Sequence, residues 1–488
     1  MALKEELESI VGSGGVLDAP ETLAAYSKDE SFVAPMMPEV VVKPRIADEV
    51  QAIVKWANQT ATPLVPVSSG PPHFRGDTVP SVPGAVVVDL SGMKQIIKVD
   101  RRNKLAIIEP GVIWSELQSE AAKESMLIPM PLMPRRSKSV IGSLLEREPM
   151  ITPKYHWTLL EPLRCCEVIW GCGDKMWTGE AGDQKGSLEE RWGQFLLQVN
   201  PMGPYQTDYY RLVSAAQGSM GIVTCASLKC EIMPQIHKVF FVQSAKLEEL
   251  IDFAYKVLRL RYGYELFIMN GANLASILAE GADQIKALKE TLPPWILILG
   301  IAGLNRLPEE RVRLQEKDIK DIALQDGQKL MTAIPGADGE QLLKILSQPS
   351  PDPYWKLRYK GGYNDVFFMT TLNRAPEFVN LMFSSSQSAG YSPSEINVYI
   401  QPTMQGVSCH CEFSLPFNPI DQNEVTRVKN LVTSGSKALM KQGAFFSRPY
   451  GSWADMVYSR DAQTTTVLKK VKGIFDPNSV MNPGKLCF

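Results

Sequence analysis

The feature that most constrains the fold of this chain is a strand–helix–strand pattern that ends in a polar loop. Residues 40–44 begin with three valines and predict a short buried strand, and residues 46–57 carry apolar side chains at helical spacing. Two acidic residues in its first turn favour that helix, because negative charge stabilises a helix N-terminus. The apolar run 63–67 then leads directly into the loop 68–76. We therefore predict an α/β unit whose loop lies at the carboxyl end of a strand, a common ligand position.

Strand and helix signals continue along the rest of the chain. In the first half we expect strands at 85–90, 104–111, 165–170, 175–178 and from 221, and a helix at 114–124. The segment 126–160 is rich in proline, methionine and arginine without a clear period, and is predicted to be loop. After Pro234 the pattern changes, which predicts a second domain at 236–425. The elements expected from there on are strands at 239–243, 266–269, 295–299, 366–371 and 396–401, and helices at 247–260, 306–330, 375–388, 422–441 and 461–473.

Length and composition restrict the class of protein. At 488 residues the chain can hold several domains, and 44% hydrophobic with 21% charged residues is the balance of a globular protein. The formal net charge of -2 predicts no broad basic surface for nucleic acid. No apolar window approaches the roughly 18 residues of a transmembrane helix, and the acidic start is unlike a secretory signal. The eight cysteines contain no Cys-x-x-Cys pair, so we expect no iron–sulfur cluster held by this chain alone, and a reducing cytoplasm.

Five short motifs occur in a fixed order around these elements. They are Gly76-Asp77-Thr78-Val79-Pro80, Glu109-Pro110-Gly111-Val112, Val140-Ile141-Gly142-Ser143, Gln217-Gly218-Ser219-Met220-Gly221-Ile222-Val223-Thr224, and a closing segment from Phe475-Asp476-Pro477 to Asn482-Pro483-Gly484-Lys485. In this order they resemble the flavin domain of the superfamily of vanillyl-alcohol oxidase and p-cresol methylhydroxylase (PCMH). Within that superfamily the chain resembles the branch of the glycolate oxidase D subunit and D-lactate dehydrogenase.

The resemblance implies an α+β fold in three parts. It implies a two-subdomain PCMH-type FAD-binding domain at 1–235 and an α/β cap, or substrate domain, with an antiparallel sheet at 236–425. The C-terminal segment 426–488 is expected to return to the FAD domain. The change of pattern after Pro234, found from the strand and helix signals alone, agrees with the first of these boundaries.

The cofactor implied by the resemblance is FAD, whose diphosphate carries two negative charges. Consecutive backbone N–H groups in a tight turn suit such an anion, and glycine lets the backbone approach it closely. Pro71 and Pro72 lack an N–H, so the first loop has fewer donors than is usual in the family. The residues expected to contact FAD are Ser68, Ser69, Gly70, His73, Phe74, Arg75, Gly76, Pro110, Gly111, Ile141, Gly142, Ser143, Gly218, Gly221, Ile222, Asn482 and Lys485.

Covalent attachment of FAD is not expected. Some members of the family attach the flavin through a histidine four residues before the glycine that ends the first loop, and here that position holds Pro72. His73 stands three residues before Gly76, where it can contact phosphate or solvent instead.

Substrate oxidation requires a base and, for an anionic substrate, a cation. Histidine titrates near neutral pH, so His410 is the candidate base, with a hydrogen-bonded core histidine as the alternative. Arg358 and Arg448 are candidates for gripping a carboxylate with two parallel hydrogen bonds, although either can be a surface ion-pair residue. Tyr450 can orient a phenol or a carboxylate, and ordinary aromatic packing is the alternative.

No metal site is expected in the cap. The hydroxy-acid branch of the family has a metal-binding pattern with two histidines, but the comparable segment here, 401–412, keeps only His410. In an alternating strand Cys409 and Cys411 lie on one face, while His410 and Glu412 lie on the other, so the four cannot converge on one ion without a bend.

Three functions therefore stay open. The first is a dehydrogenase for a small hydroxy acid or alcohol that passes electrons to a separate iron–sulfur or electron-transfer subunit. The second is an oxidoreductase for aryl alcohols or alkylphenols, which the aromatic segment 445–458 favours. The third is a non-catalytic subunit that holds FAD as an electron relay in a larger complex, which the altered first loop favours. The partner in the first two is a small organic molecule, and oligomerisation is left open.

Overall fold

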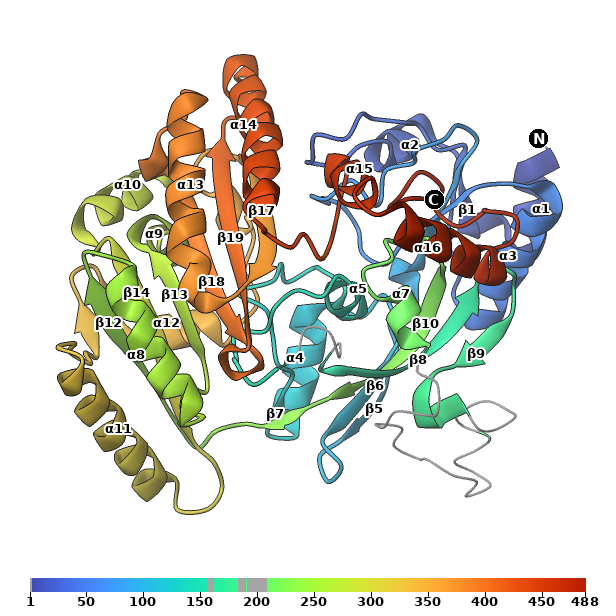
Figure 1. The fold of residues 1–488 in the computed structure, drawn as a ribbon. Helices are drawn as coiled ribbons and strands as arrows, with labels where there is room; N and C mark the ends of the chain where they lie inside the picture. Colours follow the sequence, from blue (N-terminus) through green and yellow to red (C-terminus); the bar gives the residue numbers. More distant parts are fainter. Residues whose placement is uncertain (1, 156–160, 183–189, 191–208) are drawn as a thin grey trace.

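The structure is a computed structural model that describes residues 2–155, 161–182, 190 and 209–488. It consists of two lobes side by side (Figure 1). The first lobe contains the N-terminal half of the chain together with the C-terminal helices, and the second lobe is built around one large sheet. Among these residues no helix is both long and apolar enough to cross a bilayer.

The first sheet of the first lobe follows from the strand–helix–strand pattern. Its strands are β1 (Val16–Leu17), β2 (Val40–Val42), β3 (Leu64–Val67) and β4 (Val86–Asp89), in the order β1-β2-β4-β3. Strands β2, β4 and β3 are parallel, and β1 joins them antiparallel to β2. Helices α1 (Ala2–Val11) and α3 (Ala47–Thr60) pack their apolar residues on one face of this sheet, and α2 (Pro20–Tyr26) lies against the other. The loop 68–76 leaves the end of β3, as predicted.

The second sheet of the first lobe is antiparallel. Its order is β5 (Ile96–Asp100), β6 (Leu105–Ile108), β10 (Gly221–Lys229), β8 (Leu163–Trp170) and β9 (Lys175–Trp177). The core on this sheet includes residues of α4 (Trp114–Lys123), α5 (Val140–Leu145) and α7 (Tyr210–Val213).

The segment 126–160 is not entirely loop, which corrects the prediction for its described part. Met126–Leu127 forms strand β7, which pairs with β11 (Glu231–Ile232), and Val140–Leu145 forms helix α5. Ser139 caps α5 by accepting a hydrogen bond from the Gly142 N–H. The helix is too short to show a period, and burial against the second sheet stabilises it. Residues 156–160 lie outside the described part of the chain.

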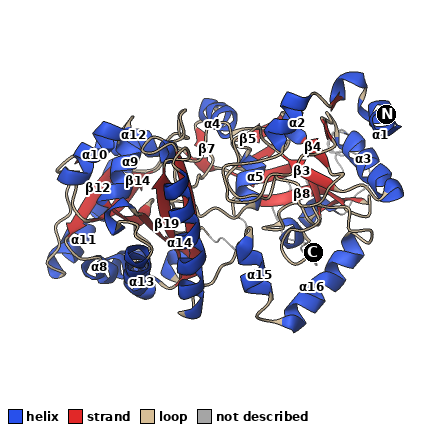
Figure 2. Cartoon of the chain, turned by 90° about the horizontal axis from the view of Figure 1, so that it is seen from above, coloured by secondary structure: helices blue, strands red, loops and turns tan. Residues whose placement is uncertain are grey.

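The second lobe contains a six-stranded antiparallel sheet, as the resemblance implied. Its order is β12 (Ile236–Ser244), β14 (Trp295–Gly303), β13 (Leu266–Asn270), β18 (Asn397–Thr403), β19 (Ser408–Phe417) and β17 (Gly362–Thr370). One face packs against α8 (Glu248–Arg259), α11 (Pro308–Gln325), α13 (Ala375–Ser388) and α14 (Gln422–Lys441). The other face packs against α9 (Gly271–Leu278), α10 (Ala282–Thr291) and α12 (Gly339–Leu346) near β12–β14, beside the short hairpin β15 (Ala333–Ile334) and β16 (Ala337–Asp338). Figure 2 shows this sheet between its helix layers.

The chain end returns to the first lobe through α15 (Ser452–Tyr458) and α16 (Ala462–Phe475) (Figure 1). Met481 then bridges Leu64 in parallel, and the Asn482 N–H donates to the Leu64 carbonyl at 2.8 Å, so this segment extends the first sheet beside β3. The boundary expected at 425/426 falls inside α14, which packs on the second lobe. The exact domain boundaries stay a prediction.

Candidate functional site

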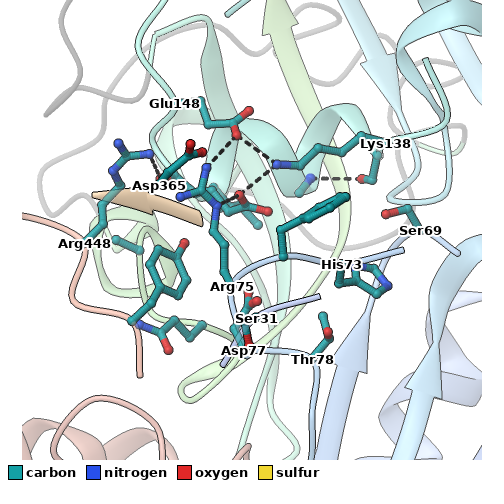
Figure 3. Close-up of a pocket in the computed structure, with 18 of the residues that line it drawn as sticks. Ser31, Ser69, His73, Arg75, Asp77, Thr78, Lys138, Glu148, Asp365 and Arg448 are labelled. Atoms are coloured by element: carbon teal, nitrogen blue, oxygen red, sulfur yellow. Dashed lines mark hydrogen bonds and ion pairs between the residues drawn. The ribbon is translucent and has the colours of Figure 1, made fainter. Parts of the chain in front are cut away.

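A cavity of about 570 Å³ lies between the two lobes. The first lobe lines it with the loop after β3, the segment 131–149 and the start of β10. The second lobe lines it with Tyr354–Asp365 and with side chains of β17, β18 and β19, and the connection at 448–453 completes the wall. Figure 3 shows charged side chains from several of these segments pointing toward one another.

The two turns that were expected to hold the diphosphate lie in contact. A Cβ atom on Gly142 would lie 2.6 Å from Ser68 Oγ, so a larger residue there would require the serine side chain to move. Ser139 Oγ accepts from the Gly142 N–H at 2.9 Å and donates to the Pro110 carbonyl at 2.6 Å. The turn 140–143 is therefore tied to the strand end at Pro110 and to the loop after β3, and together they form one wall of the cavity.

This wall has hydrogen-bond donors that fit the diphosphate of FAD. In the described part of the chain the backbone N–H groups of Ser69, His73, Phe74 and Arg75 form no hydrogen bond. Arg75 Nη1, Arg135 Nη1 and His73 Nε2 are buried polar atoms that also lack a partner among the described residues. A buried donor without an acceptor is costly, so this wall suits a ligand that is rich in anionic oxygens.

Gly218 and Gly221, which also line the cavity, allow the chain to pack closely there. Gly218 has a φ of +70°, and a Cβ atom there would lie 2.4 Å from Pro66 Cγ. A Cβ atom on Gly221 would lie 2.6 Å from the carbonyl oxygen of Ile169 in the neighbouring strand. Both positions therefore require glycine.

Gly218→Ala should lower the free energy of unfolding by about 2–4 kcal/mol, because it adds a left-handed backbone penalty to a clash with the rigid Pro66 ring. We expect the variant to retain less flavin as well. Denaturant unfolding and the visible absorption of the purified protein measure the two effects. Gly473→Ala is the matched control: Gly473 lies in α16 with open space around its Cβ position, so alanine should stabilise that helix by about 1 kcal/mol. Equal stability of the two variants would contradict the prediction.

Arg75, predicted as a charge for the diphosphate, belongs to a closed cluster of four ions. Arg75 Nε lies 3.1 Å from Glu146 Oε2, and Arg75 Nη2 lies 3.0 Å from Glu148 Oε1. Lys138 Nζ lies 2.8 Å from Glu146 and 3.0 Å from Glu148 (Figure 3). Burial opposes ionisation of Glu148, but Lys138, Arg75 and a hydrogen bond from Ser143 hold its pKa well below its usual range. The cluster is electrically balanced, and Arg75 keeps one N–H pair for a ligand.

Arg448 is a buried cation without a carboxylate partner. Only 3% of its surface is exposed, and its guanidinium lies 4.1 Å above the centre of the Phe367 ring. Nη1 donates to the Glu146 carbonyl at 3.3 Å, and among the described residues no carboxylate lies within ion-pair distance. Burial and the nearby charge of Arg75 lower the pKa of Arg448 to about 10. It stays charged at neutral pH, so this part of the cavity attracts an anion.

A chain of polar side chains runs from Arg448 along the cavity face of β19 and β17. Arg448 Nη2 lies 3.5 Å from His410 Nδ1, and His410 Nε2 lies 3.3 Å from Glu412 Oε2. Lys356 Nζ bridges Glu412 at 2.6 Å and Asp365 at 2.7 Å. Burial and the charge of Glu412 raise the pKa of Asp365, which also accepts a short hydrogen bond from Ser414.

The predicted faces of β19 are confirmed. Cys409 and Cys411 are fully buried in the helix-covered core, whereas His410 and Glu412 point to the other side, where they contact one another. In the described part of the chain no three side chains of the metal-ligating types form a cluster.

The cavity brings together many of the predicted residues but not all. Those that line it are Ser68, Ser69, His73, Phe74, Arg75, Pro110, Ile141, Gly142, Gly218, Gly221, Ile222, Arg448 and Tyr450. Those that do not line it are Gly70, Gly76, Gly111, Ser143, Asn482, Lys485, His410 and Arg358. The structure therefore does not place these residues at the cavity surface.

Three residues of the second group, Gly76, Asn482 and Lys485, form hydrogen bonds that hold the first loop in place. The Gly76 N–H donates to Asp29 Oδ2 at 2.5 Å, so it is not free for a phosphate. Lys485 Nζ donates to the Gly76 and Val79 carbonyls at 2.7 and 2.8 Å, and Asn482 Nδ2 donates to the Asp77 carbonyl at 2.8 Å. These bonds hold the first loop against the C-terminal segment.

The contacts of Arg358 and His410 do not match the roles expected for these residues. Arg358 donates to the Ala279 carbonyl at 2.9 Å and to the Pro353 carbonyl at 3.2 Å, outside the cavity, so it cannot hold the substrate in this structure. His410 is 1% exposed and lies behind Arg448 and Glu412. Burial lowers the pKa of His410 to about 4, so it is neutral at neutral pH.

Sequence reasoning missed several residues of the cavity. They are Lys138, Glu146, Glu148, Lys356, Asp365, Tyr354 and Tyr363. The only signal was the density of charge within 135–148, a segment predicted to be loop. Lys356 and Asp365 meet Glu412 through the pairing of β17 with β19, which spacing along the chain does not reveal.

Comparison with known proteins gives a consistent result. A family model described as "FAD binding domain" matches residues 38–147. D-2-hydroxyglutarate dehydrogenase of Stutzerimonas stutzeri (strain A1501) is 25% identical over 99% of this chain and 98% of its own length. The 4-cresol dehydrogenase (hydroxylating) flavoprotein subunit of Pseudomonas putida is 25% identical over 75% of this chain and 72% of its own length. The solved structure of p-cresol methylhydroxylase with substrate bound has a TM-score of 0.79 at 18% identity, covering 100% of this chain and 96% of the other. These similarities confirm the predicted α+β fold and FAD as cofactor.

Proposed function

Since the chain belongs to the flavoprotein superfamily of vanillyl-alcohol oxidase and p-cresol methylhydroxylase and is an FAD-linked oxidoreductase, we propose that it oxidises a small 2-hydroxy acid to the 2-oxo acid. The observation that carries this proposal is Arg448, a buried guanidinium in the cavity wall with no carboxylate partner among the described residues. A substrate carboxylate would supply the missing counter-ion, with the two parallel hydrogen bonds that arginine favours.

We assign FAD to the wall formed by the two touching turns. The unpartnered amides of the first loop and Arg75 would meet the diphosphate, and Ile141, Gly142, Gly218 and Ile222 would pack against the rest of the cofactor. Bound FAD supplies the acceptor for the hydride that the substrate carbon loses. His73 is buried and neutral, since burial lowers its pKa to about 4, which suits a hydrogen-bonding contact with a non-covalent flavin.

The hydroxyl proton requires a basic group in the cavity wall, and we assign Asp365 to this task. Its carboxylate lines the cavity, and burial together with the negative charge of Glu412 raises its pKa above the ordinary value, which makes it a better proton acceptor. Lys356 holds the carboxylate in place.

A second candidate substrate is an alkylphenol or aryl alcohol. Tyr354, Tyr363 and Tyr450 line the cavity, and no described side chain forms a hydrogen bond with their hydroxyls. Phe74 packs on Tyr363 with ring centres 4.9 Å apart, so part of the wall is aromatic. Two of the similar proteins above have names that refer to cresol.

Anaerobic mixing distinguishes the candidates. D-lactate or glycolate should bleach the visible flavin band if the substrate is a hydroxy acid, and 4-cresol should do so if it is a phenol. If none of these bleaches the flavin while dithionite does, the electron-relay hypothesis replaces both. Acid precipitation of the protein tests the non-covalent state, because released colour stays in solution.

We also propose a separate iron–sulfur or electron-transfer protein as the electron acceptor. The sequence has no Cys-x-x-Cys pair from which a cluster of its own could be built. The photoreduced protein should reoxidise faster with a one-electron dye than with air. Faster reoxidation by air would indicate an oxidase instead.

A further inference from the structure

We infer that His410 positions Arg448 for anion binding, and that Glu412 fixes the histidine tautomer that makes this possible. His410 then is not the group that removes the substrate proton. The inference rests on the proposed function in one respect, namely that Arg448 holds the anionic group of the substrate.

The first argument is the location of the imidazole. His410 lies on strand β19, which is next to the edge of the sheet, and it is paired with Met369 of β17 on one side and Gln401 of β18 on the other. Its side chain is buried and does not line the cavity, whereas Arg448 and Glu412, which it contacts, both line it. A general base must reach the proton that it removes, directly or through one water.

The second argument concerns which ring nitrogen carries the hydrogen. An ionised carboxylate only accepts hydrogen bonds, so His410 Nε2, 3.3 Å from Glu412, must carry the N–H. His410 Nδ1 is then left with a lone pair, and it accepts from the Arg448 guanidinium 3.5 Å away. Lys356 keeps Glu412 ionised through its contact at 2.6 Å, against the effect of burial.

The third argument is that Arg448 needs such an anchor. Its backbone approaches the second lobe through Phe445, which exchanges two hydrogen bonds with Met369 of β17 at 2.8 and 3.1 Å. Three residues later the guanidinium carbon lies 4.1 Å from the centre of the Phe367 ring, a contact that does not by itself fix the orientation of the guanidinium. The Glu146 carbonyl and His410 Nδ1 are the polar contacts that fix its orientation.

The test measures anion binding separately from turnover. Oxalate carries carboxylates but no C–H bond, so it can bind beside the flavin without being oxidised, and its Kd follows from the change in flavin absorbance. We compare wild type with His410→Ala, His410→Asn and Glu412→Gln. His237→Asn is the matched control, since His237 contacts Glu265 at 2.8 Å and does not line the cavity.

His410→Ala should weaken oxalate binding roughly tenfold, the effect of a lost hydrogen bond to a charged group. His410→Asn should restore much of the affinity, because its amide oxygen accepts from Arg448 while its NH₂ group can donate to Glu412. Glu412→Gln should also weaken binding, and His237→Asn should leave it unchanged. At saturating hydroxy acid, the limiting rate of flavin reduction should change less than about fivefold in His410→Asn.

Two results would overturn the inference. One is unchanged oxalate affinity in His410→Ala, or wild-type protein that does not bind oxalate. The other is a limiting reduction rate that falls about a hundredfold or more in both histidine variants, which is the behaviour of a base. If no hydroxy acid reduces the wild-type flavin, the proposed function fails, but the oxalate series still decides the role of His410.

Discussion

Asp365→Asn should slow flavin reduction by the hydroxy acid by about two to four decades, while the protein stays folded and yellow. Asparagine keeps the shape of the side chain and a contact with Lys356 but cannot accept the substrate proton. The substitution also removes one of the two negative charges that pair with Lys356. The group formed by Lys356, Glu412 and residue 365 therefore changes from net negative to neutral. Rapid-mixing measurement of flavin reduction at saturating substrate gives the rate directly.

The pH dependence of the flavin reduction rate is a second measurement, and the direction of its change can be predicted. In the wild type the base must be deprotonated, so the reduction rate should fall as the pH drops through the pKa of Asp365, which burial and Glu412 raise above its ordinary value. In Asp365→Asn the rate should be low and flat over the same range. Asp326→Asn is the matched control, because Asp326 pairs with Lys256 on the outer helices of the second lobe. A nearly wild-type rate in Asp365→Asn would exclude Asp365 as the base.

Arg448→Met should lower kcat/KM for the hydroxy acid by about two to three decades, the cost of removing one partner of a buried charge pair. Methionine fills a similar volume over the Phe367 ring, so the packing loss is small and the effect reports on charge. Most of the loss should appear in substrate affinity, measured as the concentration dependence of flavin reduction. Flavin content should stay at the wild-type level.

Arg358→Met is the matched control for this substitution. Both arginines were predicted as carboxylate ligands, but Arg358 donates only to backbone carbonyls outside the cavity. We expect the kcat/KM of Arg358→Met for the hydroxy acid to remain within about threefold of wild type. If the two variants lose activity equally, Arg448 has no special role in binding the anion. If Arg448→Met loses activity toward 4-cresol instead, the phenol hypothesis gains support.

Much of the fold was predictable because it depends on local patterns. Elements that pack on a sheet need apolar residues at regular positions. The sequence shows them as three valines in β2, an apolar stripe along α3 and an apolar run in β3, and each element formed where expected. The alternation in β19 likewise predicted that Cys409 and Cys411 lie on one face of the strand and that His410 and Glu412 lie on the other. Helix α5 was missed because six residues are too few to show a period.

The candidate site was predictable only in part. The order of the motifs, through the family that they resemble, indicated a diphosphate site at two turns that contain glycine and serine, and Ser68 and Gly142 do lie in contact. By contrast, Arg358 and Arg448 could not be ranked from the sequence, because both are arginines within two residues of an aromatic side chain.

Local patterns in the sequence determined the strand–helix–strand start of the chain, because periodicity is a property of short segments. The antiparallel sheet of the second lobe and the cofactor FAD followed from the family that the ordered motifs resemble. Only the tertiary structure decided which charges meet: Glu148 with Arg75 and Lys138, and Lys356 with Asp365 and Glu412. Ion pairing and burial depend on distance in space between residues far apart in the chain. For the same reason, only the tertiary structure shows that Arg448 has no carboxylate partner among the described residues and that it contacts His410.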